Sequence, residues 1–169
     1  MSTIKDSGER RAFSSGAVRD IQNGKGRCDL IPFKEVALLL ADSSGTPDLV
    51  LIEIGKYVED GDTQHLVKAI QLFCKYVTHW DIPTCILEVS KHYEEGAEKY
   101  EERNWEKGID LHCFIDSGVR HYLKHSRDDK DEPHDRAFVW NMLGAIWTHN
   151  NRLDCHDLPF ATRNLMSAD

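Results

Sequence analysis

The 169-residue sequence has no apolar run long enough to span a membrane, and no signal peptide precedes its first predicted helix. It also lacks any Cys-x-x-Cys pair. The five cysteines are scattered, at Cys28, Cys74, Cys85, Cys113 and Cys155. An odd number of separated cysteines argues against a disulfide scaffold and against structural zinc. These absences predict a cytoplasmic protein with reduced thiols and no membrane partner.

Positive charge is in the minority as well. Lys and Arg number 21 against 29 Asp and Glu, which leaves a formal net charge of −8. An acidic chain is poorly suited to bind the phosphate backbone of a nucleic acid polymer, so we expect no such partner. A small phosphate ligand is compatible with this charge, because a bound divalent metal reverses the sign of the local field.

Residues 1–30 show neither a helical nor a strand period. Their glycine-rich segment, Gly24-Lys25-Gly26-Arg27, lacks the Gly-x-x-x-x-Gly-Lys-Ser/Thr spacing of a P-loop. Two interpretations are open for this region. It is either a loose N-terminal arm or a basic substrate loop whose amides and cations approach phosphates.

Residues 31–150 carry apolar side chains at helical spacing and form the predicted catalytic domain. Helices are expected over residues 30–41, 47–58, 63–79, 83–103, 111–125 and 133–149. The segment 47–58 is ambiguous, because its β-branched residues also suit a strand. The pattern predicts an all-α domain with a helix-bundle core, followed by an irregular tail over residues 151–169.

The predicted central helix, residues 83–103, separates apolar from acidic side chains. Its expected core face consists of Ile86, Val89, Tyr93, Ala97 and Tyr100. Its acidic face consists of Glu88, Glu94, Glu95, Glu98 and Glu102. The ordinary interpretation is a solvated face, because Lys91 and Lys99 are close enough to pair with these glutamates.

A second acidic pair favours a metal site instead. Glu132 and Asp135 lie three residues apart at the start of the predicted helix 133–149, and Glu95 and Glu98 have the same spacing. Capping accounts for one acid at that helix start, but Asp135 lies further in. Two helices that each present such a pair can surround an ion with oxygen ligands alone, which suits Mg²⁺ or Mn²⁺ rather than zinc.

These motifs resemble those of a known family. Glu94-Glu95-x-x-Glu98 followed by Glu132-x-x-Asp135 resembles the Glu-Glu-x-x-Glu … Glu-x-x-Asp signature of the all-α, MazG-like nucleoside triphosphate pyrophosphohydrolases. Four flanking segments narrow the resemblance to the phage and bacterial dATP/dGTP diphosphohydrolases. They are residues 24–30, 99–108, 116–121 and 131–137. The resemblance covers residues 14–35 and 83–149, and we interpret residues 42–82 as an insertion.

The resemblance implies a reaction and assigns roles. Glu95, Glu98, Glu132 and Asp135 would bind Mg²⁺ or Mn²⁺, and Glu94 would be an accessory residue of the catalytic site. A metal-activated water would attack the α-phosphorus of a (deoxy)nucleoside triphosphate, with purine nucleotides (dGTP and dATP) as the expected substrates. The products would be the nucleoside monophosphate and pyrophosphate. A phage-encoded protein of this kind would act in the host cytoplasm.

Substrate contacts follow from the same segments. The candidate cations for the β and γ phosphates are Lys25, Arg27, Lys107 and Arg120. Trp105 is expected either to stack on a base or to belong to the core. Asn104, its neighbour in the matching segment, is a further candidate for a substrate contact.

Two other functions stay open at this point. An HD-type metal phosphohydrolase is suggested by His134-Asp135 and by His121 and His125 at i, i+4 spacing. A non-catalytic nucleotide- or protein-binding helical module would leave the acids solvated. A catalytic cysteine has no identifiable partner, because Cys113 and its neighbour His112 are not expected to share a helix face.

Assembly is the last expectation from the sequence. Electrostatic catalysis works best where water is largely excluded, so the acidic face of the helix 83–103 needs a cover. A symmetric partner subunit is the simplest cover, and MazG-like enzymes also assemble as dimers or tetramers. We therefore expect a homodimer or homotetramer with the site near a subunit interface.

Overall fold

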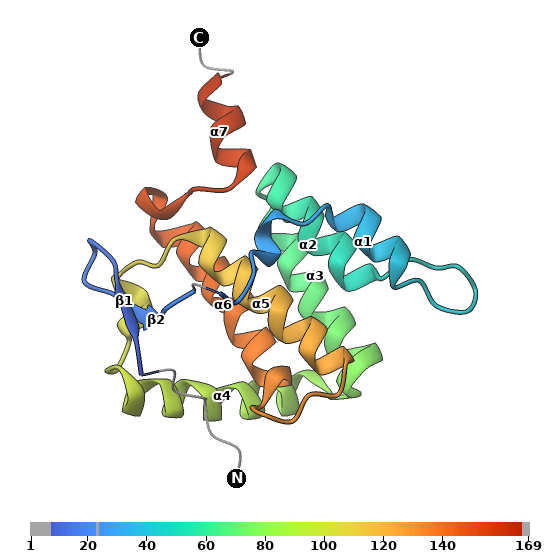
Figure 1. The fold of residues 1–169 in the computed structure, drawn as a ribbon, viewed down its shortest axis with the longest axis horizontal. Helices are drawn as coiled ribbons and strands as arrows, with labels where there is room; N and C mark the ends of the chain where they lie inside the picture. Colours follow the sequence, from blue (N-terminus) through green and yellow to red (C-terminus); the bar gives the residue numbers. More distant parts are fainter. Residues whose placement is uncertain (1–7, 23, 167–169) are drawn as a thin grey trace.

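The computed structural model describes residues 8–22 and 24–166 (Figure 1). The remaining residues, parts of the predicted N-terminal arm and C-terminal tail, lie outside the described residues. The chain is mostly helical, as expected. Its α-helices are α1 (Phe33–Leu39), α2 (Leu49–Asp60), α3 (Thr63–Phe73), α4 (Ile82–Lys99), α5 (Leu111–Ser126), α6 (His134–Asn151) and α7 (Pro159–Met166). Shorter elements are β1 (Arg10–Ala12), β2 (Val18–Asp20), η1 (Cys28–Leu30), the π-helical η2 (Cys74–Thr78), η3 (Asn104–Lys107) and η4 (Leu153–Cys155).

Aspartates fix the starts of three helices. The Asp48 carboxylate accepts a hydrogen bond from the Leu51 amide at the start of α2. Asp62 and Asp81 make equivalent caps on α3 and α4. The ambiguous segment 47–58 is therefore helical, as predicted. Its β-branched residues are accommodated because Val50 and Ile54 are buried in the core.

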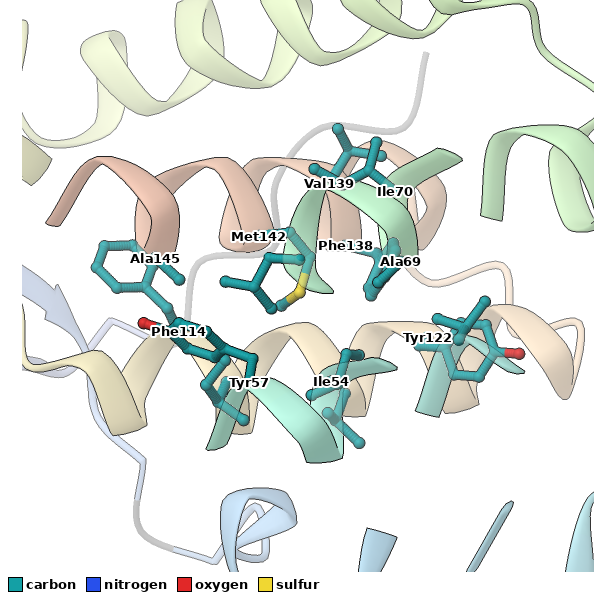
Figure 2. Packing of buried hydrophobic residues seen from close by; sticks show 14 of the residues in the cluster. Ile54, Tyr57, Ala69, Ile70, Phe114, Tyr122, Phe138, Val139, Met142 and Ala145 are labelled. Carbon is teal, nitrogen blue, oxygen red and sulfur yellow. The ribbon is translucent and has the colours of Figure 1, made fainter. Parts of the chain in front are cut away.

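The core lies between α2, α3, α5 and α6 (Figure 2). The closest approach is between α5 and α6, where two glycines make room for side chains of the facing helix. A Cβ on Gly118 would lie 2.3 Å from the Met142 Cε, and a Cβ on Gly144 would lie 2.4 Å from the Phe114 Cε1. In the described part of the chain, no helix has both the length and the apolar character needed to cross a bilayer.

The N-terminal arm contains a hairpin that the sequence did not predict. β1 and β2 pair antiparallel, with Arg11 opposite Arg19. Asn104 completes the hairpin from far along the chain. Its Oδ1 accepts from the Val18 amide at 2.9 Å, and its Nδ2 donates to the Val18 carbonyl at 2.8 Å. Strands of three residues held by such a distant side chain show no local periodicity.

The predicted core face of α4 is wrong in part. Ile86 is 59% exposed, whereas Cys85, Val89 and His92 are buried. The helix also ends at Lys99 instead of near residue 103. The buried face of α4 is the one that packs against α6. Cys85 and His92 lie on this face, and each precedes by one residue a position that was predicted to be buried, Ile86 and Tyr93.

Replacing Gly144 tests the α5–α6 contact. Gly144→Ala forces Phe114 or the α6 backbone to move, so we expect a loss of about 1–3 kcal/mol in the free energy of unfolding. Gly96→Ala in α4 is the matched control, because nothing lies within 4 Å of its added Cβ. Denaturant unfolding measures both. A Gly144→Ala variant as stable as Gly96→Ala would contradict the close packing.

Candidate functional site

A cavity of about 820 Å³ is lined by residues of the hairpin, the C-terminal half of α4, the η3 segment, α5 and α6. Its wall carries cationic, acidic and aromatic side chains together. Its volume falls in the range of small-molecule and cofactor sites. The cavity joins segments that are far apart in sequence, including parts of the N-terminal arm.

Asp116 fastens the segment after β2 to α5. Its buried carboxylate accepts from the Gln22 Nε2 at 2.5 Å, from the Cys28 amide at 2.6 Å and from the Arg120 guanidinium. Arg120 in turn donates to the carbonyl oxygens of Lys25 and Gly26, at 3.1 and 3.3 Å. Asp116 and Arg120 therefore hold the glycine-rich segment at the cavity, with Lys25 in its wall.

Asp20 closes the hairpin onto the end of α4. Its carboxylate accepts from the Lys99 Nζ at 2.8 Å and from the Tyr100 hydroxyl at 2.9 Å. The Lys99 side chain is only 8% exposed. This contact joins β2 to the stretch that carries the acidic motif.

The structure does not bring the four predicted metal ligands together. Glu95 accepts from the Arg136 Nη2 at 2.7 Å, and Asp135 accepts from the amide of Arg136. Glu98 is exposed, and only Glu132 lines the cavity. Among the described residues, these four do not form any group of three or more donor atoms within 4.8 Å of one another. Glu94, the accessory carboxylate, does line the cavity.

Glu132 belongs instead to a group with two histidines. The Nδ1 atoms of His121 and His134 lie 3.0 Å apart, and the Glu132 Oε1 is 3.8 and 3.7 Å from them. When two ligand atoms each lie about 2.1 Å from one metal ion, they are roughly 3–3.7 Å apart if the ligand–metal–ligand angle is about 90–120°. The distances within this group are close to that range. Burial and the nearby His134 lower the pKa of His121, which keeps its imidazole neutral. Asp131 bonds the other ring nitrogen of His134 at 2.8 Å and orients that ring. The three donors therefore fit a divalent metal.

A second polar group lies at the start of α5. The His112 imidazole bonds Asp157 through Nδ1, and its Nε2 is 3.3 Å from the Cys113 Sγ. Asp110, His112 and Asp157 also have donor atoms within 4.8 Å of one another. The expectation that Cys113 has no identifiable partner is wrong, because the His112 imidazole contacts its thiol although the two residues are adjacent in the chain. Asp157 rotates the imidazole so that its far nitrogen reaches the adjacent thiol.

The predicted substrate contacts divide into two sets. Lys25, Asn104, Trp105 and Arg120 line the cavity. Arg27 and Lys107 are not among the residues of its wall. Arg27 makes a bidentate pair with Asp29, and Lys107 pairs with Glu101. Trp105 also packs against Trp147, with ring centroids 4.9 Å apart, so it serves the core as well as the cavity.

A family model described as "dATP/dGTP diphosphohydrolase, N-terminal" matches residues 68–157, just over half of the chain. The chain belongs to the dATP/dGTP diphosphohydrolase family. No curated protein and no solved structure matches it. The match begins inside the segment that we interpreted as an insertion and covers α4, α5 and α6. The elements shared with the diphosphohydrolase family thus include Glu132, both histidines of its group and most of the cavity wall.

Two residues of the cavity wall were not predicted from the sequence. Arg19 comes from β2 and His92 from α4, and both line the wall. Arg19 lies in residues 1–30, where the sequence shows neither a helical nor a strand period. His92 lies in the predicted central helix, of whose polar residues only the glutamates were considered as site residues. Their placement depends on contacts with α6, which no local pattern displays.

The His112–Asp157 pair predicts a pH-dependent stability. The bond to Asp157, with the contact to Cys113, raises the pKa of His112 to about 10. A group with a raised pKa stabilises the fold fully below its unfolded pKa of about 6.5, and this contribution is lost as the pH rises through about 10.

Asp157→Asn removes the charge but keeps an oxygen for the His112 amide. We expect the stability difference between native protein and variant to shrink between about pH 6 and pH 10.5, measured by urea unfolding. A difference that stays constant over this range would show that the pair does not titrate as described.

Proposed function

We propose that the cavity binds a purine deoxynucleoside triphosphate, dGTP or dATP, and hydrolyses it to the monophosphate and pyrophosphate. The observation that carries this proposal is the position of Glu132. It lies in the wall of a nucleotide-sized cavity, in a metal-competent group, and 3.9 Å from the Lys124 Nζ. The family match supports hydrolysis of such a nucleotide.

The phosphates lie at the basic part of the wall. Lys25, Arg120 and Lys124 supply positive charge there, and burial lowers the pKa of Lys25. Binding of a triphosphate would favour the charged form of this partly desolvated lysine, because the anion would then lie close to the ammonium group. Asp116 keeps Arg120 in place through their ion pair.

A divalent metal, when bound, neutralises phosphate charge and supplies an activated water. Glu132, His121 and His134 would hold it, and Asp131 fixes the ring of His134. A mixed imidazole and carboxylate set is less suited to Mg²⁺, whose preferred ligands are oxygens, than to a divalent transition metal. Glu94, in the same wall, is the carboxylate that orients or deprotonates the attacking water.

The all-oxygen set is the competing ligand assignment. It consists of Glu95, Glu98, Glu132 and Asp135, and it requires Glu95 to leave Arg136. That guanidinium is 10% exposed and would lose a charged partner. Glu132 belongs to both sets, whereas the histidines belong to one set and Glu98 to the other.

Matched substitutions distinguish the two sets. We expect Glu132→Gln to lower dGTP turnover by about 100-fold or more, because removal of a ligand costs at least as much as removal of a residue that supports one. His134→Gln lowers turnover similarly if the histidine group binds the metal, and Glu98→Gln does so if the oxygen set binds it. Glu88→Gln on the same helix as Glu98 is the control, since Glu88 pairs with Lys91 outside the cavity.

The assay scores deoxynucleoside monophosphate and pyrophosphate separately from diphosphate and orthophosphate, with Mg²⁺ or Mn²⁺. Circular dichroism confirms that each variant keeps its helices. Full turnover by Glu132→Gln would remove this site from the reaction.

We also propose that the chain forms a homodimer or homotetramer. The exposed apolar side chains Ile82, Ile86 and Leu87 at the start of α4 support this assignment. Ile86→Lys should lower the mass measured by light scattering, whereas Leu153→Lys in η4, at a residue that is 78% exposed, should not. A monomer that is fully active at assay concentration would contradict the proposal.

A further inference from the structure

Two residues that line the cavity each carry a buried polar atom that has no hydrogen-bond partner among the described residues. These atoms are the Arg19 Nη1 and the His92 Nδ1. A buried donor or acceptor without a partner is unfavourable, and most such groups in folded proteins are satisfied. Two of them on one cavity indicate the polar contacts of a ligand.

Arg19 is held in a fixed orientation. Its Nη2 donates to the Asn141 Oδ1 at 2.5 Å, and the Asn141 Nδ2 donates to the Ala137 carbonyl at 2.8 Å. The guanidinium carbon lies 5.1 Å from the ring centroid of Phe114 and 5.6 Å from that of Trp140. With Nη2 engaged and the plane stacked, Nη1 is a preorganised donor, and arginine has no acceptor to offer.

His92 is a neutral side chain next to this donor. It is 8% exposed, and its ring centroid lies 5.5 Å from that of Trp140. Burial, together with the charges of Arg136, Arg19 and Lys99, lowers the pKa of His92 to about 3. A neutral imidazole carries its proton on either nitrogen, so its Nδ1 can donate or accept.

The surroundings of these two residues suit a base better than a phosphate. Tyr93, Trp105 and Trp140 provide flat aromatic surface in the same wall. Lys25 is exposed, whereas Arg19 and His92 present buried atoms. A triphosphate is expensive to desolvate, so it belongs on the side of Lys25, the most exposed of the cations proposed for the phosphates, and the base belongs further in.

We propose that Arg19 and His92 read the edge of the purine base, with Arg19 Nη1 donating to N7 and His92 Nδ1 facing the group at C6. This inference rests on the proposed function. Guanine and adenine share the N7 acceptor, and they differ at C6, where guanine has an oxygen acceptor and adenine an amino donor. Arg19 thus selects purines over pyrimidines, and His92 accommodates both purines by exchanging its donor and acceptor roles.

The test is a comparison of 2′-deoxyguanosine α,β-methylene triphosphate with its 7-deaza analogue, which has a carbon at position 7. Calorimetry with Mn²⁺ measures binding of both without turnover. We expect native protein to bind the 7-deaza compound roughly tenfold or more weakly, since a hydrogen bond from a charged donor is lost. Equal affinities would overturn the proposal, and this arm needs no variant to fold.

Variants assign the effect to Arg19. In Arg19→Met we expect the ratio of the two affinities to fall to about one. Arg11→Met is the matched control, because Arg11 also lines the cavity and pairs with Arg19 in the hairpin register. Its ratio should equal that of native protein. If Arg19→Met weakens the binding of both compounds by the same factor and so keeps the native ratio, Arg19 contacts phosphate and the proposal is wrong.

His92→Phe tests the second contact. We expect weaker binding of the guanine and adenine methylene analogues, and unchanged binding of a purine analogue with hydrogen at C6. An equal loss for all three compounds would overturn the role of His92. Because these measurements need no hydrolysis, selective binding by a chain that hydrolyses nothing would contradict the proposed function alone.

Discussion

The carboxylate of Asp116 is the point on which the cavity depends. It is 1% exposed and is bonded to Arg120, to the Gln22 side chain and to the Cys28 amide. A buried ion pair is tolerated only when further hydrogen bonds satisfy its remaining atoms, and here residues of the N-terminal segment supply them. The ion pair and the position of that segment therefore require each other. Without Asp116, the Gln22 side chain and the Cys28 amide would lose their acceptor, and Arg120 would lose the ion pair that places it against the Lys25 and Gly26 carbonyls.

The chain itself supplies much of the cover that a catalytic cavity needs. The hairpin lies across the end of α4 through Asp20, and Asn104 holds β2 by its backbone. These contacts place Arg19 beside α6 and bury its Nη1 atom. A partner subunit is thus not required to enclose the inner part of the cavity, although it can still add to the outer part near the exposed start of α4.

The sequence predicted the elements that have a local signal. Helical spacing located α2, α3, α4, α5 and α6, and the family motifs pointed to Glu132 and Arg120. The hairpin, the exposure of Ile86 and the places of Arg19 and His92 in the cavity wall were not predicted. Each depends on a partner in another segment, such as Asn104 for Val18 or Asn141 for Arg19. The i, i+3 spacing of Glu95 and Glu98 suggested that Glu95 binds a metal. In the structure, Glu95 forms an ion pair with Arg136 of the facing helix α6, a contact that spacing within α4 does not reveal.

In the proposed reaction, water attacks the α-phosphorus of a nucleotide bound in this cavity. Hydrolysis of dGTP in ¹⁸O-labelled water, followed by mass spectrometry of both products, tests this attack most directly. We expect one ¹⁸O atom in the deoxynucleoside monophosphate and unlabelled pyrophosphate. Label in the pyrophosphate, or orthophosphate as the only inorganic product, would contradict the proposed reaction.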